Sequence, residues 1–206
     1  MLSYQTVEPH TLELIKKIMD TEAADGLRLV GGTALALQYG HRSSVDIDLF
    51  GLTDTDNESL RDVLAESGEL KIIKESKNIS IYSIDGIKVD IVNYKYQWLR
   101  PAVMEDGIRL ASPEDIAAMK INAAEGRGTK KDFIDIYFLL EHYPLERILE
   151  FYSSKYPEHS IFRALMSLTY FDDADCQPMP KMFYNVPWEE MKRVISNAVT
   201  GYSKNT

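Results

Sequence analysis

Two aspartates in the first quarter of the chain have the spacing of a metal-binding pair. Asp46 and Asp48 alternate with apolar residues across positions 45–50. Such alternation predicts a strand, and side chains two residues apart on a strand point to the same face. Two buried carboxylates on one face repel each other, and leaving them uncompensated is costly. Mg²⁺ (or Mn²⁺) would compensate them, because these hard cations take oxygen ligands and share them with phosphate groups.

Asp90 is a third candidate ligand. It lies in a second alternating stretch, residues 87–92, and is again flanked by apolar residues. If this strand lies beside residues 45–50, Asp90 completes a carboxylate cluster with Asp46 and Asp48. If the strand instead lies at an edge of the sheet, Asp90 merely faces water. The residues alone leave both arrangements open.

A glycine turn precedes the carboxylates. Gly31, Gly32 and Thr33 stand between an apolar strand predicted over 27–30 and a brief helix predicted over 33–39. Glycines let the backbone approach a phosphate closely, and a helix N-terminus favours negative charge. Thr33 adds a hydroxyl donor. The same residues also suit an ordinary strand-to-helix turn.

The remaining patterns predict a mixed front and a helical back. The dipeptide Asp85-Gly86 predicts a hairpin between two strands, and Ser112-Pro113 predicts the start of a helix. Other predicted strands cover 71–75, 79–84 and 87–92. One predicted helix is capped by Asn57 or Ser59 and ends near residue 66, another follows Thr129, and the last begins at Trp188. The remaining predicted helices cover 7–24, 113–125, 145–155 and 159–170. We therefore expect an α+β fold: a small mixed β-sheet with flanking helices over 1–111, followed by an all-helical C-terminal lobe over 112–206. A cleft between two such lobes is a natural ligand site.

The order of these motifs resembles a known family. Residues 30–35, 40–42 and 44–50 read VGGTAL, GHR and SVDIDLF. This arrangement is similar to that of the AbiEii-type toxin nucleotidyltransferases of bacteria, in the polymerase β-like nucleotidyltransferase superfamily. That family places a glycine and a small hydroxyl residue before an Asp-x-Asp pair, positions held here by Gly32, Thr33, Asp46 and Asp48. Serine is the commoner hydroxyl residue, so Thr33 is a mild departure.

The resemblance extends to a cluster of charges further along the chain. The family has a lysine late in one helix, then an arginine, then Lys-Asp-x-x-Asp opening the next helix; Lys120, Arg127, Lys131, Asp132 and Asp135 match in order. The resemblance implies that the cations contact the triphosphate. It also implies that Asp132 orients Lys120 or the nucleotide base, or acts as a general base. Salt bridges between neighbouring surface helices are the alternative. Arg42, beside the metal strand, is a further candidate phosphate contact.

The resemblance implies an enzyme that transfers a nucleoside monophosphate from a nucleoside triphosphate to an acceptor hydroxyl. RNA such as tRNA is the implied acceptor, and a cognate antitoxin protein is the implied partner. Two alternatives remain from the residues. One is a small-molecule acceptor, as in the aminoglycoside nucleotidyltransferases, and the other is a nucleotide-binding module of the same fold without turnover.

Composition narrows the setting of the protein. Its net charge of −9 disfavours a protein that coats nucleic acid through a general basic field, so an RNA would have to be held locally. The single cysteine, Cys176, rules out an intramolecular disulfide and a cysteine-rich zinc site. No stretch has the roughly 18 apolar residues of a membrane span, and the N-terminal residues lack the pattern of a signal peptide. We therefore expect a cytoplasmic protein without a membrane partner.

Overall fold

The computed structural model describes residues 1–53 and 55–205, which form two compact units. Unit 1 consists of Met1–Lys95 and Pro101–Ala111. Unit 2 consists of Tyr96–Arg100 and the described residues from Ser112 on. Within the described residues, no helix combines the length and the apolar content needed to cross a bilayer.

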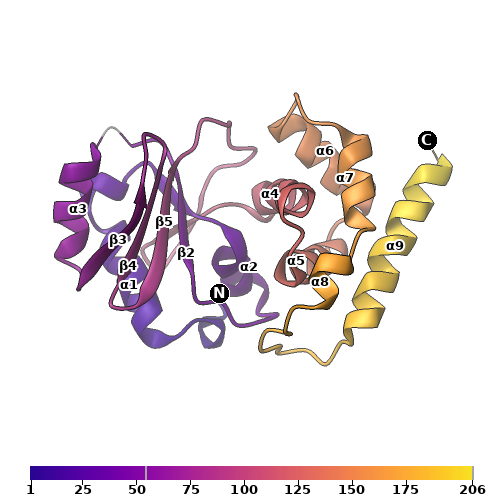
Figure 1. Cartoon of the computed structure of the whole chain (residues 1–206), viewed down its shortest axis with the longest axis horizontal. Coiled ribbons are helices and arrows are strands. Elements are labelled where there is room, and N and C mark those ends of the chain that lie inside the picture. Colours follow the sequence, from indigo (N-terminus) through magenta and orange to yellow (C-terminus); the bar gives the residue numbers. More distant parts are fainter. Residues whose placement is uncertain (54, 206) are drawn as a thin grey trace. The chain divides into compact units, whose positions relative to one another are not determined.

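Unit 1 is built around one mixed β-sheet (Figure 1). β2 pairs with β5 in parallel and β1 pairs with β7 in parallel, whereas the other neighbouring strands are antiparallel. The strands lie in the spatial order β3 (Leu70–Glu75), β4 (Ile79–Ile84), β5 (Ile87–Asn93), β2 (Ile47–Gly51), β1 (Leu27–Leu29), β7 (Ile108–Leu110) and β6 (Val103–Glu105). Strands β2 and β5 alternate between fully buried apolar residues and partly exposed ones. This alternation gives the sheet one face that packs on the core.

Three α-helices belong to this sheet: α1 (Pro9–Met19), α2 (Gly31–Tyr39) and α3 (Asn57–Ala65). The α3 helix packs on β3 and β4. Its N-cap is Asp56, whose carboxylate accepts the backbone N–H groups of Glu58 and Ser59. The predicted cap at Asn57 or Ser59 was therefore wrong by one to three positions, because the carboxylate just before the helix reaches both orphan donors.

Two Asp-Gly hairpins occur in the sheet, and the sequence pattern predicted only one of them. Asp85 and Gly86 join β4 to β5 with φ angles of 51° and 84°, as expected for a two-residue hairpin turn. Asp106 and Gly107 join β6 to β7 in the same way, with φ angles of 53° and 77°. Strands of three residues are too short to show a period of two, which explains why this hairpin was missed.

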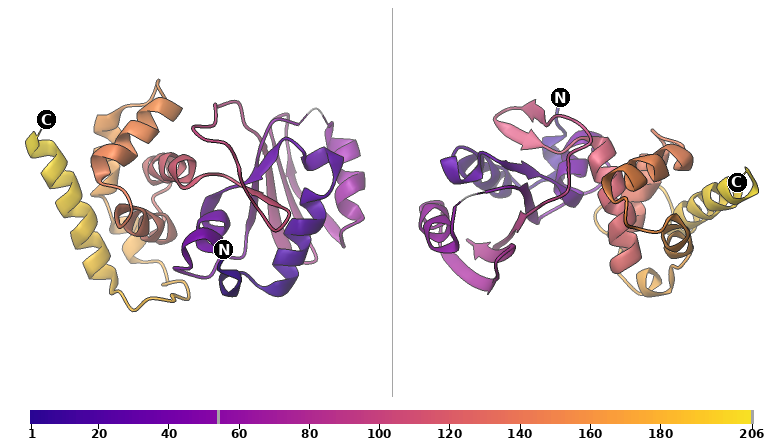
Figure 2. Two further views of the ribbon diagram at one scale, coloured as in Figure 1. Left: turned by 180° about the vertical axis from the view of Figure 1, so that it is seen from behind. Right: turned by 90° about the horizontal axis from the view of Figure 1, so that it is seen from above.

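The part of unit 2 from Ser112 on is helical, in agreement with the predicted helical C-terminal lobe. Its helices are α4 (Pro113–Gly126), α5 (Lys130–Leu140), α6 (Leu145–Lys155), α7 (Ile161–Leu168), the short α8 (Asp172–Asp175), which was not predicted, and α9 (Trp188–Asn205). Both predicted caps are present, since Ser112 accepts the backbone N–H of Asp115 and Thr129 forms a capping box with Asp132. The α4 helix packs on α5, α6 and α7, and α9 packs along α5, α6 and α7 (Figure 2). The predicted fold class is confirmed.

A buried ion pair ties the segment Tyr96–Arg100 into unit 2. The ammonium group of Lys155 lies 2.7 Å from Asp115 Oδ1 and donates to the carbonyl oxygen of Gln97 at 3.0 Å. It also lies 4.5 Å from the ring centre of Trp98. The carboxylate of Asp115 accepts the backbone N–H groups of Leu99 and Arg100 at 2.9 and 3.2 Å. Both charged side chains are completely buried, so the segment is held by charge-assisted bonds shielded from water.

Candidate active site

Two of the three predicted carboxylates lie on neighbouring strands. Asp48 of β2 is in register with Asp90 of β5, and the two strands run parallel. Residues paired in this way point to the same face of a sheet. Since β5 lies between β4 and β2, the alternative that Asp90 belongs to an edge strand is wrong. Asp46 directly precedes β2, which begins at Ile47 rather than at the predicted residue 45.

The carboxylate of Asp90 is only partly neutralised by the protein. Lys88 lies two residues earlier on β5, and its ammonium group is 2.5 Å from Asp90 Oδ2. The other oxygen, Oδ1, is buried and has no hydrogen-bond partner among the described residues. A buried acceptor without a partner is costly, and such atoms often mark a site for an ion or another ligand. Lys88 was not among the predicted site residues, although its two-residue spacing from Asp90 on one strand places both side chains on the same face.

The carboxylates of β2 and β5 provide part of the ligand set of a divalent cation. Asp48 and Asp90 supply hard carboxylate oxygens, and Asp90 Oδ1 is open to a ligand. Within residues 1–53 and 55–205, however, no three acidic, histidine or cysteine side chains are gathered closely enough to hold an ion by themselves. The residues therefore fit a cation that takes only some ligands from protein and the rest from phosphate and water, as Mg²⁺ usually does.

Gly31 brings the start of α2 against the carboxylate of Asp48. Helix α2 begins at Gly31, two residues earlier than predicted, and Gly31 has a φ of +66°. A Cβ atom at this position would lie 2.4 Å from Asp48 Oδ2. The backbone N–H of Val30 also donates to the carbonyl oxygen of Asp48 at 2.9 Å. The close approach requires glycine, so the turn is more than a flexible connection.

We expect Gly31→Ala to destabilise the protein more than Gly86→Ala. Both glycines have positive φ, but a Cβ at Gly86 would have no heavy atom within 4 Å, whereas at Gly31 it would clash with Asp48. The backbone strain of about 1–2 kcal/mol is common to both variants, so the difference between them reports the contact with Asp48. Urea denaturation measures both unfolding free energies. Equal losses in the two variants would show that Asp48 moves aside without cost.

Gly32, Thr33 and Arg42 form the buried support of this turn. A Cβ on Gly32 would lie 2.2 Å from Arg42 Nη2, so the guanidinium group packs against the glycine backbone. Thr33 donates to the carbonyl oxygen of Asp46, and its hydroxyl lies 2.9 Å from that of Ser44. Thr33 is fully buried and Arg42 is 2% exposed. In this structure both residues connect α2 to the segment before β2, and their contact with a phosphate remains a prediction.

The second predicted cluster lies in unit 2 and is also assembled. The ammonium group of Lys120 lies 3.0 Å from Asp132 Oδ1 and 2.6 Å from Asp135 Oδ2. Arg127 donates to both oxygens of Asp132, at 2.9 and 3.1 Å. Lys120, Asp132 and Asp135 are buried, so they form an interior network and not the surface salt bridge considered above. Lys131 is exposed and stands outside this network.

Asp132 is held in its ionised form. Burial by itself would raise the pKa of this carboxyl, but Lys120 and Arg127 outweigh burial. Thr129 adds a hydroxyl donor at 2.7 Å, and the pKa of Asp132 falls well below its usual range. A carboxylate with so low a pKa accepts a proton poorly. Among the predicted roles of Asp132, the geometry therefore favours orienting Lys120 over acting as a general base.

Comparison with solved structures places the fold among nucleotidyltransferases. The chain resembles the nucleotidyltransferase toxin MenT4 from Mycobacterium tuberculosis with a TM-score of 0.58 and 11% identity, over 94% of this chain and 86% of that one. It resembles the protein JHP933 from Helicobacter pylori with the same TM-score of 0.58 and 19% identity, over 98% of this chain and 92% of that one.

Comparison with sequences identifies the family. The family described as "Nucleotidyl transferase AbiEii toxin, Type IV TA system" matches residues 13–193. An uncharacterised protein from Aquifex aeolicus is 32% identical over 205 residues, covering 94% of this chain and 96% of the relative. The chain belongs to the AbiEii nucleotidyl transferase toxin family, as the sequence motifs predicted.

Proposed function

We propose that this nucleotidyltransferase joins a nucleoside monophosphate to a hydroxyl group of RNA, in a reaction that requires Mg²⁺ (or Mn²⁺). The proposal also includes a cognate antitoxin protein, as expected for a member of a toxin family. Family membership supports the transfer reaction and the toxin role. The RNA acceptor and the metal ion are the parts of the proposal that go beyond the family.

One observation carries the metal requirement. Asp48 and Asp90 are in register on adjacent parallel strands, and Asp90 Oδ1 is buried without a hydrogen-bond partner among the described residues. Two carboxylates on one face of adjacent strands favour a cation beside them, because a counter-ion reduces their repulsion and supplies a partner for Asp90 Oδ1. We propose that Asp48 and Asp90 hold the cation together with phosphate and water, and that Asp46 joins them as a third ligand once the ion is bound.

In the proposed reaction, an acceptor oxygen forms a bond to the α-phosphorus while the bond from that phosphorus to the bridging oxygen of the β-phosphate breaks. Pyrophosphate leaves, and the hydroxyl proton passes to a base. A bound Mg²⁺ supplies charge stabilisation for the phosphate oxygens. Gly31 lets the backbone come close to the carboxylate of Asp48. We propose that Lys120, Arg127 and Lys131 help to bind the triphosphate, with Asp132 and Asp135 orienting Lys120.

A transfer assay tests the proposal. The protein is incubated with each of the four nucleoside triphosphates labelled at the α-phosphate, with Mg²⁺, and with either total RNA or a mixture of aminoglycosides. We expect labelled RNA and released pyrophosphate, both abolished by EDTA. Label on the aminoglycosides alone would replace RNA by the small-molecule acceptor. Nucleotide binding without pyrophosphate release under every condition would support the non-catalytic module and contradict the proposed reaction.

A further inference from the structure

Unit 2 contains a polar pocket that none of the candidate active-site residues line. Its volume is about 170 Å³, and its lining residues are Leu99, Arg100, Arg147, Glu150, Phe151 and Ser154. We call it the Arg100–Arg147 pocket. A single water needs only about 15 Å³ of cavity volume, so the pocket has room for a group of several heavy atoms.

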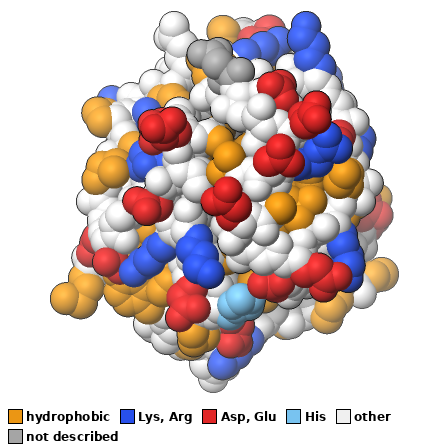
Figure 3. Space-filling model, turned by 90° about the vertical axis from the view of Figure 1, so that its left-hand side faces the viewer, with side chains coloured by type: hydrophobic (Ala, Val, Ile, Leu, Met, Phe, Trp, Pro, Cys, Tyr) orange, Lys and Arg blue, Asp and Glu red, His pale blue; other side chains and the backbone are white. Residues whose placement is uncertain are grey.

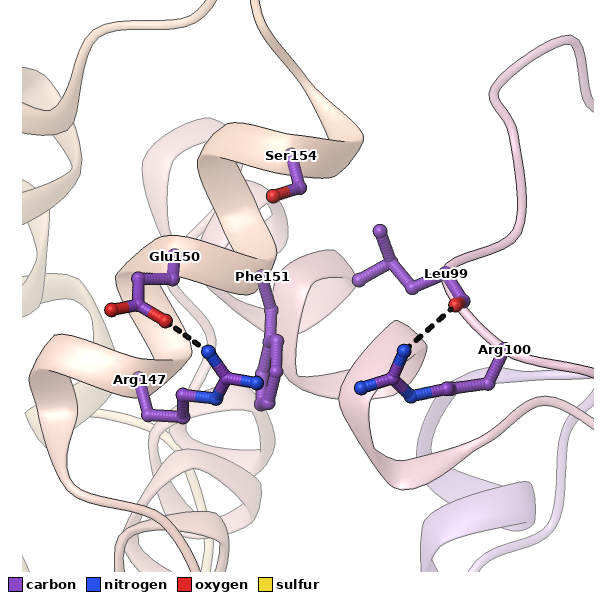
Figure 4. Close-up of a pocket in the computed structure, with 6 residues that line it drawn as sticks. All are labelled: Leu99, Arg100, Arg147, Glu150, Phe151 and Ser154. Carbon is purple, nitrogen blue, oxygen red and sulfur yellow. Dashed lines mark hydrogen bonds and ion pairs between the residues drawn. The ribbon is translucent and has the colours of Figure 1, made fainter.

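Two guanidinium groups approach this pocket from different elements. Figure 4 shows Arg147 extending from α6 and Arg100 extending from the Tyr96–Arg100 segment, so that the two side chains point toward one another. Each side chain is 50% exposed. Arginine stays protonated in proteins, and two such groups facing one space favour an anion there.

Arg147 packs against an aromatic ring and has donors to spare. Its guanidinium carbon lies 4.9 Å from the ring centre of Phe151, a cation–π contact that favours this position of the side chain. It bonds to Glu150 through Nη1. Its Nε and Nη2 groups donate to no acceptor within residues 1–53 and 55–205. An exposed ion pair one turn apart contributes little stability, so Glu150 does not prevent a second, stronger anion from binding.

Arg100 has a buried anchor beneath its exposed guanidinium group. Its backbone N–H is bonded to the buried carboxylate of Asp115 at 3.2 Å, so its position on the chain is fixed. Its Nε lies 3.4 Å from Glu114, and its Nη1 lies 3.4 Å from the carbonyl oxygen of Leu99. These long bonds are weak, and a phosphate would form shorter, charge-assisted ones. Ser154 is exposed at the rim and adds a hydroxyl group.

We propose that the Arg100–Arg147 pocket binds a phosphate group of a single-stranded polynucleotide. The identification of that polynucleotide as the RNA acceptor rests on the proposed function, whereas the phosphate site itself does not. Because the net charge is −9, the protein as a whole does not attract a polyanion electrostatically. A polyanion must therefore bind at a local group of cations. On the one face seen in Figure 3, acidic and basic side chains are interspersed and form no continuous basic area.

The pocket suits a phosphodiester better than a nucleoside triphosphate. A triphosphate is accompanied by Mg²⁺ and favours carboxylates for that ion. The pocket has only one lining carboxylate, and it is paired with Arg147. Two arginines are instead well matched to the oxygens of one phosphate group, which they bind with parallel hydrogen bonds.

Binding of a short fluorescently labelled single-stranded RNA, measured by anisotropy without nucleotide or Mg²⁺, tests the proposal. We expect Arg100→Gln and Arg147→Gln each to weaken binding about tenfold, as loss of one charge-assisted bond predicts. Each variant should also reduce the slope of log K against log salt by about one. Arg193→Gln is the matched control, because Arg193 pairs with Glu190 at the same three-residue spacing as Arg147 with Glu150. We expect this control to bind like the wild type.

The other outcomes separate the pocket from the proposed function. If RNA binding were weakened equally in all three variants, the effect would come from general charge, and the proposed phosphate site would be wrong. Weaker binding of a nucleoside triphosphate, with RNA binding unchanged in Arg100→Gln and Arg147→Gln, would also overturn the polynucleotide assignment. Inorganic phosphate should compete with RNA for the wild type more effectively than for Arg147→Gln, and an equal effect would count against the site. Loss of transfer in Asp48→Asn with RNA binding intact is expected, because the two sites use different residues.

Discussion

Asp48→Asn is expected to reduce nucleotide transfer at least about a hundredfold, without loss of folding stability. Asparagine keeps the shape of the side chain, so the close contact with Gly31 is preserved. The substitution removes the negative charge that lies in register with Asp90, and with it one ligand for the proposed cation. Single-turnover transfer of labelled nucleotide, at saturating triphosphate and Mg²⁺, measures the effect.

Stability provides the second readout for Asp48→Asn. Asparagine keeps the size and the hydrogen-bonding capacity of the side chain, so the melting temperature should change little while activity falls. Asp62→Asn is the matched control, because Asp62 is an exposed aspartate on α3. It should leave both activity and stability unchanged. If Asp48→Asn retained as much transfer as Asp62→Asn, the proposed metal ligand would be wrong.

Asp115→Asn is expected to destabilise the protein by about 3–5 kcal/mol. The change leaves the ammonium group of Lys155 completely buried, with the carbonyl oxygen of Gln97 as a remaining polar contact. An uncompensated buried charge is among the most costly defects in a folded protein. Chemical denaturation followed by far-ultraviolet circular dichroism gives the unfolding free energy. An exposed pair offers the control: Arg193→Gln should cost less than about 1 kcal/mol.

A double substitution identifies the cause of this loss. Asp115→Leu combined with Lys155→Met removes both charges, and the buried side chains are then apolar. We expect the double variant to be more stable than Asp115→Asn, because no unpaired charge remains inside. If the double variant were as unstable as Asp115→Asn, the loss of stability would come from the missing bonds between Asp115 and the backbone of Leu99 and Arg100. It would then not come from the ammonium group of Lys155.

Local patterns predicted most elements of the fold. Alternation predicted β4 and β5, and the cap residues Ser112 and Thr129 located the starts of α4 and α5. These features depend on residues close in sequence, which explains why a single sequence reveals them. Pairing of distant strands is different. Nothing local in residues 45–50 indicates that β2 lies beside β5 and not beside another strand, so the position of Asp90 stayed open until the register was known.

The candidate site was predicted in its residue types but not in its environment. Arg42 was proposed as a phosphate contact, and the structure places it 2% exposed behind Gly32. Lys120 was expected at a ligand, and it lies between two buried carboxylates. Burial of a charged side chain depends on which elements cover it, and sequence spacing does not reveal that covering. The Arg100–Arg147 pocket escaped prediction for the same reason, since its arginines lie 47 positions apart in the numbered sequence.

The attachment of Tyr96–Arg100 to Asp115 and Lys155 limits how the two units can be exchanged between proteins during evolution. The chain passes from unit 1 into unit 2 at Tyr96, returns at Pro101, and leaves again at Ser112. A single cut therefore cannot leave both units complete, because a cut before Tyr96 removes Pro101–Ala111 from unit 1 and a cut after Ala111 removes Tyr96–Arg100 from unit 2. If a gene fusion replaced everything after Ala111 with a new module, Tyr96–Arg100 would lose its bonds to Asp115 and Lys155. Exchange of whole units by recombination should therefore be rare, and the two units should diverge together within the family.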